Sequence, residues 1–171
     1  MLNNLLQLRA MFGSRLLAGC FVATAAVAQS LDPLPVEITL AAEQLVNAPS
    51  SDGTPAKRFE PARQVRADEE VHYTVRIRNT SDRPIPHVIV TRPIPDNTLY
   101  VPESAVGPAA SVTFSIDDGQ TFDVPERLRV AGADGEVRDA EPADYTTIRW
   151  ELGYPLAAGA TAIARFRVTL R

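Results

Sequence analysis

Alternation of apolar and polar positions is the dominant pattern along this chain of 171 residues. In residues 71–79 (VHYTVRIRN) an apolar side chain falls at every second position, which is typical of a strand with one buried face. Residues 146–152 and 161–170 show the same period. The three runs predict antiparallel strands, with Tyr73 and Trp150 on the apolar, core-facing sides.

Shorter runs between turn signals predict further strands. They are residues 36–40 with a continuation to about 46, residues 88–90, residues 98–101, residues 112–116 and residues 121–124. The PIP sequence at 93–95 ends the second of these runs, because proline lacks a backbone donor. The DDGQ sequence at 117–120 predicts a hairpin turn.

Two longer stretches show no clear period. Residues 55–67 predict an extended connector with an edge strand near Phe59, and residues 125–144 predict surface loop with a strand at 128–130. The whole pattern, seven or eight short strands without a convincing helix, predicts an all-β fold. We expect an antiparallel, immunoglobulin-like β-sandwich, with a β-barrel as the structural alternative.

The N-terminus predicts a secretory signal peptide over residues 1–28. Arg9 and Arg15 supply positive charge, and residues 16–28 form a short apolar run that ends in Ala-Val-Ala. Cleavage is expected before Gln29. The run is shorter than the roughly 20 residues that cross a bilayer, so we expect no transmembrane span.

Cys20 offers a second interpretation of this segment. The sequence LAGC at 17–20 is similar to a bacterial lipobox, which would place a lipid anchor on Cys20. However, Arg15 precedes the cysteine closely, and most of the apolar run follows it. The sequence therefore favours Cys20 as an ordinary residue of the signal core.

The mature chain is expected to form one folded unit. Residues 29–65 should form an N-terminal strand and connector, and residues 66–171 the sandwich core.

The mature chain is acidic. The signal removes two of the 17 basic residues and none of the 21 acidic ones, which leaves a net charge of −6. It also removes the single cysteine, so no disulfide is expected. An acidic exported protein is a poor nucleic-acid binder.

Several segments resemble a known family. They are YTVRIRNT at 73–80, HVIVT at 87–91, PIP at 93–95, TLYVPES at 98–104, VTFSIDDG at 112–119, IRW at 148–150 and PLAAG at 155–159. Over roughly residues 66–170 they resemble the bacterial conserved-repeat domain known as domain of unknown function 11. The resemblance implies an exported Ig-like module, often repeated in tandem in cell-surface proteins, without enzyme activity or catalytic residues.

Two departures from that family bear on function. Arg92 stands before the proline corner, where the family usually has an acid. The chain also holds one copy of the domain, which argues against a long adhesive stalk.

The sequence offers little evidence for a catalytic or metal-binding site. His72 and His87 lack zinc-ligand spacing, and the chain has no nucleophile–base, phosphate-loop or dinucleotide motif. Asp117, Asp118 and Asp123 bracket the predicted hairpin tip. A second acid-rich segment follows, with Asp134, Glu136, Asp139, Glu141 and Asp144. Such oxygens suit calcium, but the spacing of an EF-hand is missing and Asp-Asp-Gly is a good turn. Solvated loops are therefore favoured over a calcium site.

Arginines on the polar faces of the strands suggest a binding surface. Arg76, Arg78, Arg149, Arg165 and Arg167 all point away from the apolar faces, and Arg92 is added because of its unusual position. Strands that share a sheet would gather these residues into a basic patch, suited to phosphate or carboxylate groups. The competing interpretation is that outward charges keep a sheet soluble.

The sequence thus predicts an exported, non-enzymatic Ig-like module that acts in binding or as a structural element at the bacterial envelope. It is expected in the periplasm or outside the cell, with an envelope protein or polymer as partner. Loops or an exposed sheet edge, to which a partner adds a strand, are further candidate surfaces. The alternatives are a calcium-binding accessory domain and, least favoured, a small periplasmic hydrolase.

Overall fold

The computed structural model describes residues 35–49, 54–132 and 135–171. Residues 33–171 form one compact unit. The predicted signal peptide, Cys20 and Asp134 lie outside the described residues, so the structure says nothing of them. In the described part of the chain no helix has the length and apolar character needed to cross a membrane.

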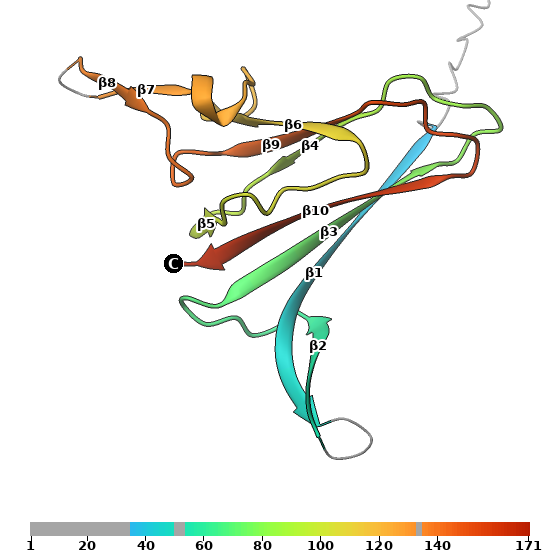
Figure 1. Ribbon diagram of the computed structural model, residues 1–171, viewed down its shortest axis with the longest axis horizontal. Coiled ribbons are helices and arrows are strands. Elements are labelled where there is room, and N and C mark those ends of the chain that lie inside the picture. Colours follow the sequence, from blue (N-terminus) through green and yellow to red (C-terminus); the bar gives the residue numbers. More distant parts are fainter. Residues whose placement is uncertain (1–34, 50–53, 133–134) are drawn as a thin grey trace, which may run out of the picture. The chain divides into compact units, whose positions relative to one another are not determined.

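The described residues form ten strands and one 3-10 turn (Figure 1). The strands are β1 (Val36–Pro49), β2 (Pro55–Pro61), β3 (Glu70–Asn79), β4 (Ile89–Pro93), β5 (Thr98–Tyr100), β6 (Ala110–Ser115), β7 (Arg129–Ala131), β8 (Val137–Asp139), β9 (Thr147–Leu152) and β10 (Thr161–Leu170). The turn, η1, covers Pro125–Arg127.

Two antiparallel sheets form a sandwich, which confirms the predicted fold class. One sheet has five strands in the order β2-β1-β3-β10-β5, and the other has three in the order β4-β9-β6. Figure 1 shows the two layers, with β1, β3 and β10 in one and β4, β6 and β9 in the other. Strands β7 and β8 form a separate two-stranded ribbon.

The core lies between the two sheets and is built from the predicted alternating faces. The fully or almost fully buried residues include Val75 and Ile77 of β3, Ile148 and Trp150 of β9, and Ala162, Ala164, Phe166 and Val168 of β10. The rings of Trp150 and Phe166 lie 5.8 Å apart between their centroids and join the two layers. Alternation along each strand therefore predicted the core-facing positions correctly.

Asn79 links the end of β3 to two loops, between β3 and β4 and between β9 and β10, that connect the two sheets. Its side chain is fully buried, and Nδ2 donates hydrogen bonds to the backbone oxygens of Arg83, Leu156 and Ala157. Its Oδ1 accepts hydrogen bonds from the backbone N and the Oγ of Ser81. The predicted polar turn after β3 is thus a tertiary link as well as a local one.

Strand β1 departs from the predicted pattern. Its apolar positions should be half-buried, but Ile38 is 40% exposed and Leu40 is 48% exposed. Register places Ile38 opposite Ile77 and Leu40 opposite Val75, so all four side chains lie on the core-facing side of the sheet. The three-stranded sheet is narrower than its partner and leaves this part of β1 uncovered.

The remaining differences concern short segments. Residues 121–124 are not a strand, because their pairing is limited to one bridge between Asp123 and Phe114. The predicted strand at 128–130 starts one residue later, as β7, and the acid-rich segment after it contains β8. Ile89 is exposed while Val88 and Val90 are buried, so the apolar run at 88–90 is covered on one side only.

Candidate functional site

Four of the six predicted binding-face arginines lie on the outer face of the five-stranded sheet. In β3 and β10, Arg78 lies opposite Thr161, Arg76 opposite Ile163, Arg165 opposite Thr74, and Arg167 opposite His72. Each of four successive cross-strand rows therefore holds one arginine. Rows on one face are spaced by two residues, about 6.8 Å, so the four arginines form a diagonal line of roughly 20 Å. We call these residues the arginine line.

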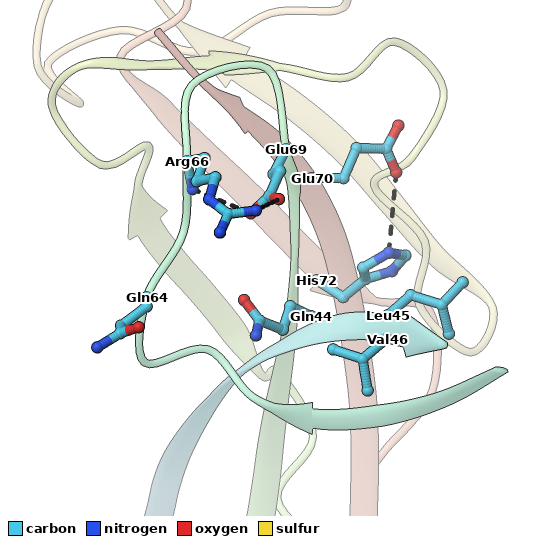
Figure 2. A pocket seen from close by; sticks show the side chains of 8 residues that line it. All are labelled: Gln44, Leu45, Val46, Gln64, Arg66, Glu69, Glu70 and His72. Atoms are coloured by element: carbon cyan, nitrogen blue, oxygen red, sulfur yellow. Dashed lines mark hydrogen bonds and ion pairs between the residues drawn. The ribbon is translucent and has the colours of Figure 1, made fainter. Parts of the chain in front are cut away.

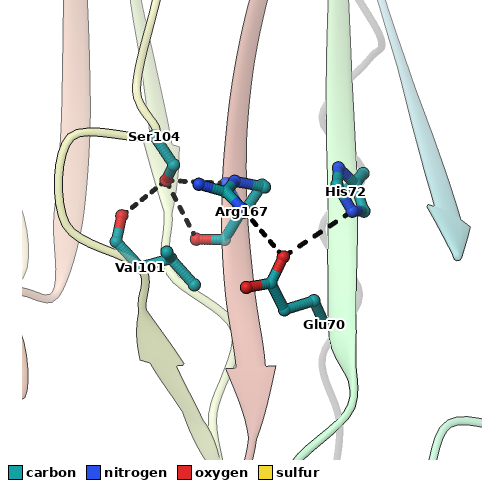
Figure 3. Close-up of polar contacts among 5 residues, drawn as sticks. All are labelled: Glu70, His72, Val101, Ser104 and Arg167. Carbon is teal, nitrogen blue, oxygen red and sulfur yellow. Dashed lines mark hydrogen bonds and ion pairs between the residues drawn. The ribbon is translucent and has the colours of Figure 1, made fainter. Parts of the chain in front are cut away.

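One end of the arginine line is held by an ion pair. The Arg167 guanidinium donates to Glu70 Oε2 at 2.9 Å, and His72 Nε2 lies 3.8 Å from the same oxygen (Figure 3). Burial lowers the pKa of His72 below its usual 6.5, and Arg167 lowers it further, whereas Glu70 and Glu43 act in the opposite direction. His72 therefore loses its proton more readily than a free histidine.

The other three arginines of the line have no carboxylate within ion-pairing distance among the described residues. Arg76, Arg78 and Arg165 are all exposed. Glu37 on β1 lies opposite Arg78 in the register but forms no ion pair with it in the described structure. The line thus presents three unneutralised guanidinium groups on an otherwise acidic chain.

Three shallow hollows follow this face of the sheet. The first, of about 500 Å³, lies beside the second half of β1 and is lined by Gln44, Arg66, Glu70 and His72, among others (Figure 2). His72 also lines the second hollow, of about 300 Å³. Arg165 lines the second and the third, which measures about 440 Å³. Because neighbouring hollows share lining residues, they lie next to one another, and we call the three together the track.

Ser104 fixes the rim of this track. Its hydroxyl donates to the backbone oxygen of Val101 at 2.6 Å and accepts a hydrogen bond from the backbone N of Arg167 at 3.0 Å (Figure 3). The loop after β5 is thereby held against β10. The hydroxyl is occupied by backbone partners and makes no hydrogen bond to His72 in the described structure.

The structure does not bring the other two predicted arginines to this face. Arg149 of β9 belongs to the three-stranded sheet, where its guanidinium stacks 3.5 Å from the ring centroid of Phe122. Arg92 lies opposite Ile148 on the core-facing side of β4, and its Nε is buried without a hydrogen-bond partner in the described structure. A single six-arginine patch is therefore not formed, because the strands divide between two sheets.

The weak calcium candidates Asp117, Asp118 and Asp123 are engaged in local contacts and turns of the chain itself. Asp117 accepts hydrogen bonds from Ser115 Oγ, from the backbone N and hydroxyl of Thr121, and from the backbone N of Gln120. These bonds, led by that of Ser115, lower the pKa of Asp117 to about 2. Asp118 and Gly119 have positive φ angles of 58° and 86°, as the turn requires.

The three candidates do not form a ligand set. Asp123 accepts from the backbone N of Val124 and lies 3.7 Å from Arg127. Across the described ranges, no group of three or more histidine, cysteine or acidic side chains is placed to hold a metal ion.

Sequence reasoning named an exposed sheet edge as a candidate surface but did not locate it. The first half of β1, with Ile38 and Leu40 exposed, combines an uncovered apolar face with a sheet edge. Alternation indicates which face a side chain occupies, but only the arrangement of the sheets shows whether that face is covered.

Comparison with family models, curated proteins and solved structures finds no match to this chain. The resemblance to domain of unknown function 11 therefore stays a prediction.

Proposed function

We propose that the chain is an exported, non-enzymatic Ig-like module that binds an anionic polymer of the bacterial envelope. The observation that carries the proposal is the arginine line: one arginine in each of four successive rows, three of them without an acidic partner in the described structure. A planar guanidinium binds carboxylate or phosphate oxygens through two parallel hydrogen bonds. Rows about 6.8 Å apart suit a chain that carries acidic groups at regular intervals.

The binding energy would come from several weak contacts along the track. Single exposed ion pairs contribute about 0–1 kcal/mol, so specificity has to come from the number and spacing of the arginines. The hollows beside Arg165 and His72 would receive the body of the polymer, while the guanidinium groups hold its charged substituents. Because exposed charges are screened by salt, binding should weaken as ionic strength rises.

The test is binding of the purified protein to murein sacculi and to soluble alginate, both of which carry carboxylates. Replacement of Arg76, Arg78 and Arg165 by Gln should weaken binding at least tenfold. A matched control replaces Arg83, Arg127 and Arg171, three exposed arginines outside the line, by Gln. This control removes the same charge and should lower affinity no more than about twofold.

Three outcomes would contradict the proposal. Equal loss of affinity in both triple variants would show that only net charge matters. Failure of the wild-type protein to bind either probe at low salt would exclude a carboxylate polymer. Binding to phosphatidylglycerol vesicles with no binding to either polymer would assign the arginine line to a membrane surface instead.

A further inference from the structure

The first half of β1 has an unpaired backbone edge. Pro35 O accepts a hydrogen bond from Thr80 N, so odd-numbered residues of β1 direct their backbone groups toward β3. Even-numbered residues direct theirs the other way, as the bond from Ala62 N to Ala42 O shows. Strand β2 pairs with β1 only from Glu43 onward. The N–H and C=O groups of Val36, Ile38 and Leu40 therefore face a lane that no strand of the described chain occupies.

The same residues present apolar side chains. Ile38 is 40% exposed and Leu40 is 48% exposed, both on the core-facing side of the sheet. An edge that combines free backbone groups with apolar side chains is a template for strand pairing.

The other edges of the two sandwich sheets carry protective features. Strand β2 has prolines at both ends and Lys57 and Arg58 between them. Strand β4 ends in Pro93, and β5 has only three residues. The edge of β6 is bridged by Asp123. The segment from Val36 to Ala42 contains no proline, lysine or arginine, so it lacks these features.

We propose that this edge pairs antiparallel with the same edge of a second copy of the chain. The free edge runs from Val36 to Leu40, because Ala62 already occupies the place beside Ala42. In the register that uses all of it, Val36 lies opposite Leu40 of the second copy, Glu37 opposite Thr39, and Ile38 opposite Ile38. Even residues meet even residues, which is what two edges with outward-facing even residues require.

The side chains are compatible in this register. On the core-facing side, Ile38 meets Ile38 and Val36 meets Leu40, and cross-strand neighbours of this kind have Cβ atoms about 5 Å apart. On the outer side, Glu37 meets Thr39, so no like charges lie opposite each other. A segment that is self-complementary in length, polarity and charge fits a two-fold pair.

The pairing has a consequence for the outer face. A two-fold axis perpendicular to the sheet keeps both outer faces on one side, so the dimer would carry two arginine lines on one continuous sheet. Bivalent binding raises affinity without any new contact. The dimer itself does not rest on the proposed polymer binding, and it is tested without a polymer.

Sedimentation velocity over a concentration series measures the dimer directly. A contact of five residue pairs is at the small end of specific interfaces, which bury roughly 1,200–2,000 Å², so we expect dissociation in the micromolar range. Ile38→Lys and Ile38→Glu should each weaken the dimer at least tenfold. The matched control is Leu45→Lys, which changes a residue of the same strand, 42% exposed, where β2 already fills the edge. Its dimer should be unchanged.

A mixture of the two variants tests the register. Ile38→Lys of one copy faces Ile38→Glu of the other, while the Val36–Leu40 pairs on both sides are native. The mixture should therefore dimerise where each variant alone does not. Circular dichroism of each variant at low concentration separates loss of pairing from loss of folding.

Amide hydrogen exchange gives a second readout. The amides of Ile38 and Leu40 should become protected as protein concentration rises, whereas those of Thr39 and Ala41, which face β3, should be protected throughout. A protein that stays monomeric at several hundred micromolar would overturn the proposal. So would a dimer that tolerates both substitutions, or one whose Ile38 and Leu40 amides exchange freely.

Discussion

Ile38 and Ile77 lie opposite each other on neighbouring strands and on the same face of one sheet, yet their environments differ completely. Ile77 is fully buried, whereas Ile38 is 40% exposed. Both belong to regular alternating strands, so local sequence does not distinguish them. The difference arises because the three-stranded sheet covers β3 and β10 but leaves this part of β1 uncovered.

Strand β3 and the first half of β1 also differ in how many of their backbone groups are hydrogen-bonded. Strand β3 is hydrogen-bonded on both sides, by β1 and by β10, so its backbone is satisfied. The first half of β1 is paired on one side only. A single sheet thus contains a region built for stability and a region whose backbone and side chains remain available for association.

The largest expected effect comes from truncating this isoleucine pair. Ile77→Ala leaves a cavity in the packed core and should lower the free energy of unfolding by about 2–5 kcal/mol. Ile38→Ala truncates a side chain that is 40% exposed and can leave no closed cavity, so it should cost only about 1 kcal/mol. Urea denaturation at low protein concentration, where the chain is monomeric, measures both. Similar costs for the two substitutions would mean that β1 is covered in solution.

A second prediction concerns what holds the covering sheet in place. Asn79→Ala removes the donor to three backbone oxygens and leaves them unpaired at the end of β3. We expect a loss of about 2–3 kcal/mol of unfolding free energy, since unsatisfied buried polar groups are costly. Ser81→Ala, which removes one hydroxyl from the same turn, is the control and should cost less than about 1 kcal/mol. Thermal and urea unfolding would show whether the two variants differ as expected.

Alternation predicted the strands of the core because a buried face imposes a period of two on the sequence. It placed Val75, Ile77, Trp150 and Phe166 correctly on the inner side. It could not predict which strands share a sheet, since pairing joins residues far apart in the chain. That is why Arg149 was grouped with Arg76 and Arg165 although it lies on the other sheet.

Arg92 and the β7–β8 ribbon show two further limits of prediction from the sequence. Arg92 was grouped with the outward arginines, but its register with Ile148 places it on the core-facing side of β4. Strands β7 and β8 are three residues long and carry charged side chains, so neither periodicity nor hydropathy marks them clearly. The arginine line became visible only when the register of β3 and β10 ordered its members into successive rows.

The smallest expected effect lies at the boundary between the two regions, where the ring of His72 on β3 meets the ring of Phe59 on β2 with centroids 5.0 Å apart. Burial lowers the pKa of His72 below 6.5, so stability is fully present above pH 6.5 and decreases as pH falls through the lower, folded-state value. NMR titration of His72 measures that pKa.

Variants of the neighbouring groups should move the pKa of His72 in opposite directions. Phe59→Ala should raise it toward 6.5 by exposing the ring to water, and Arg167→Gln should raise it by removing a nearby positive charge. Glu70→Gln and Glu43→Gln should each lower it, because both carboxylates favour the protonated ring. A pKa that does not respond to Phe59→Ala would show that Phe59 does not shield the His72 ring from water in solution.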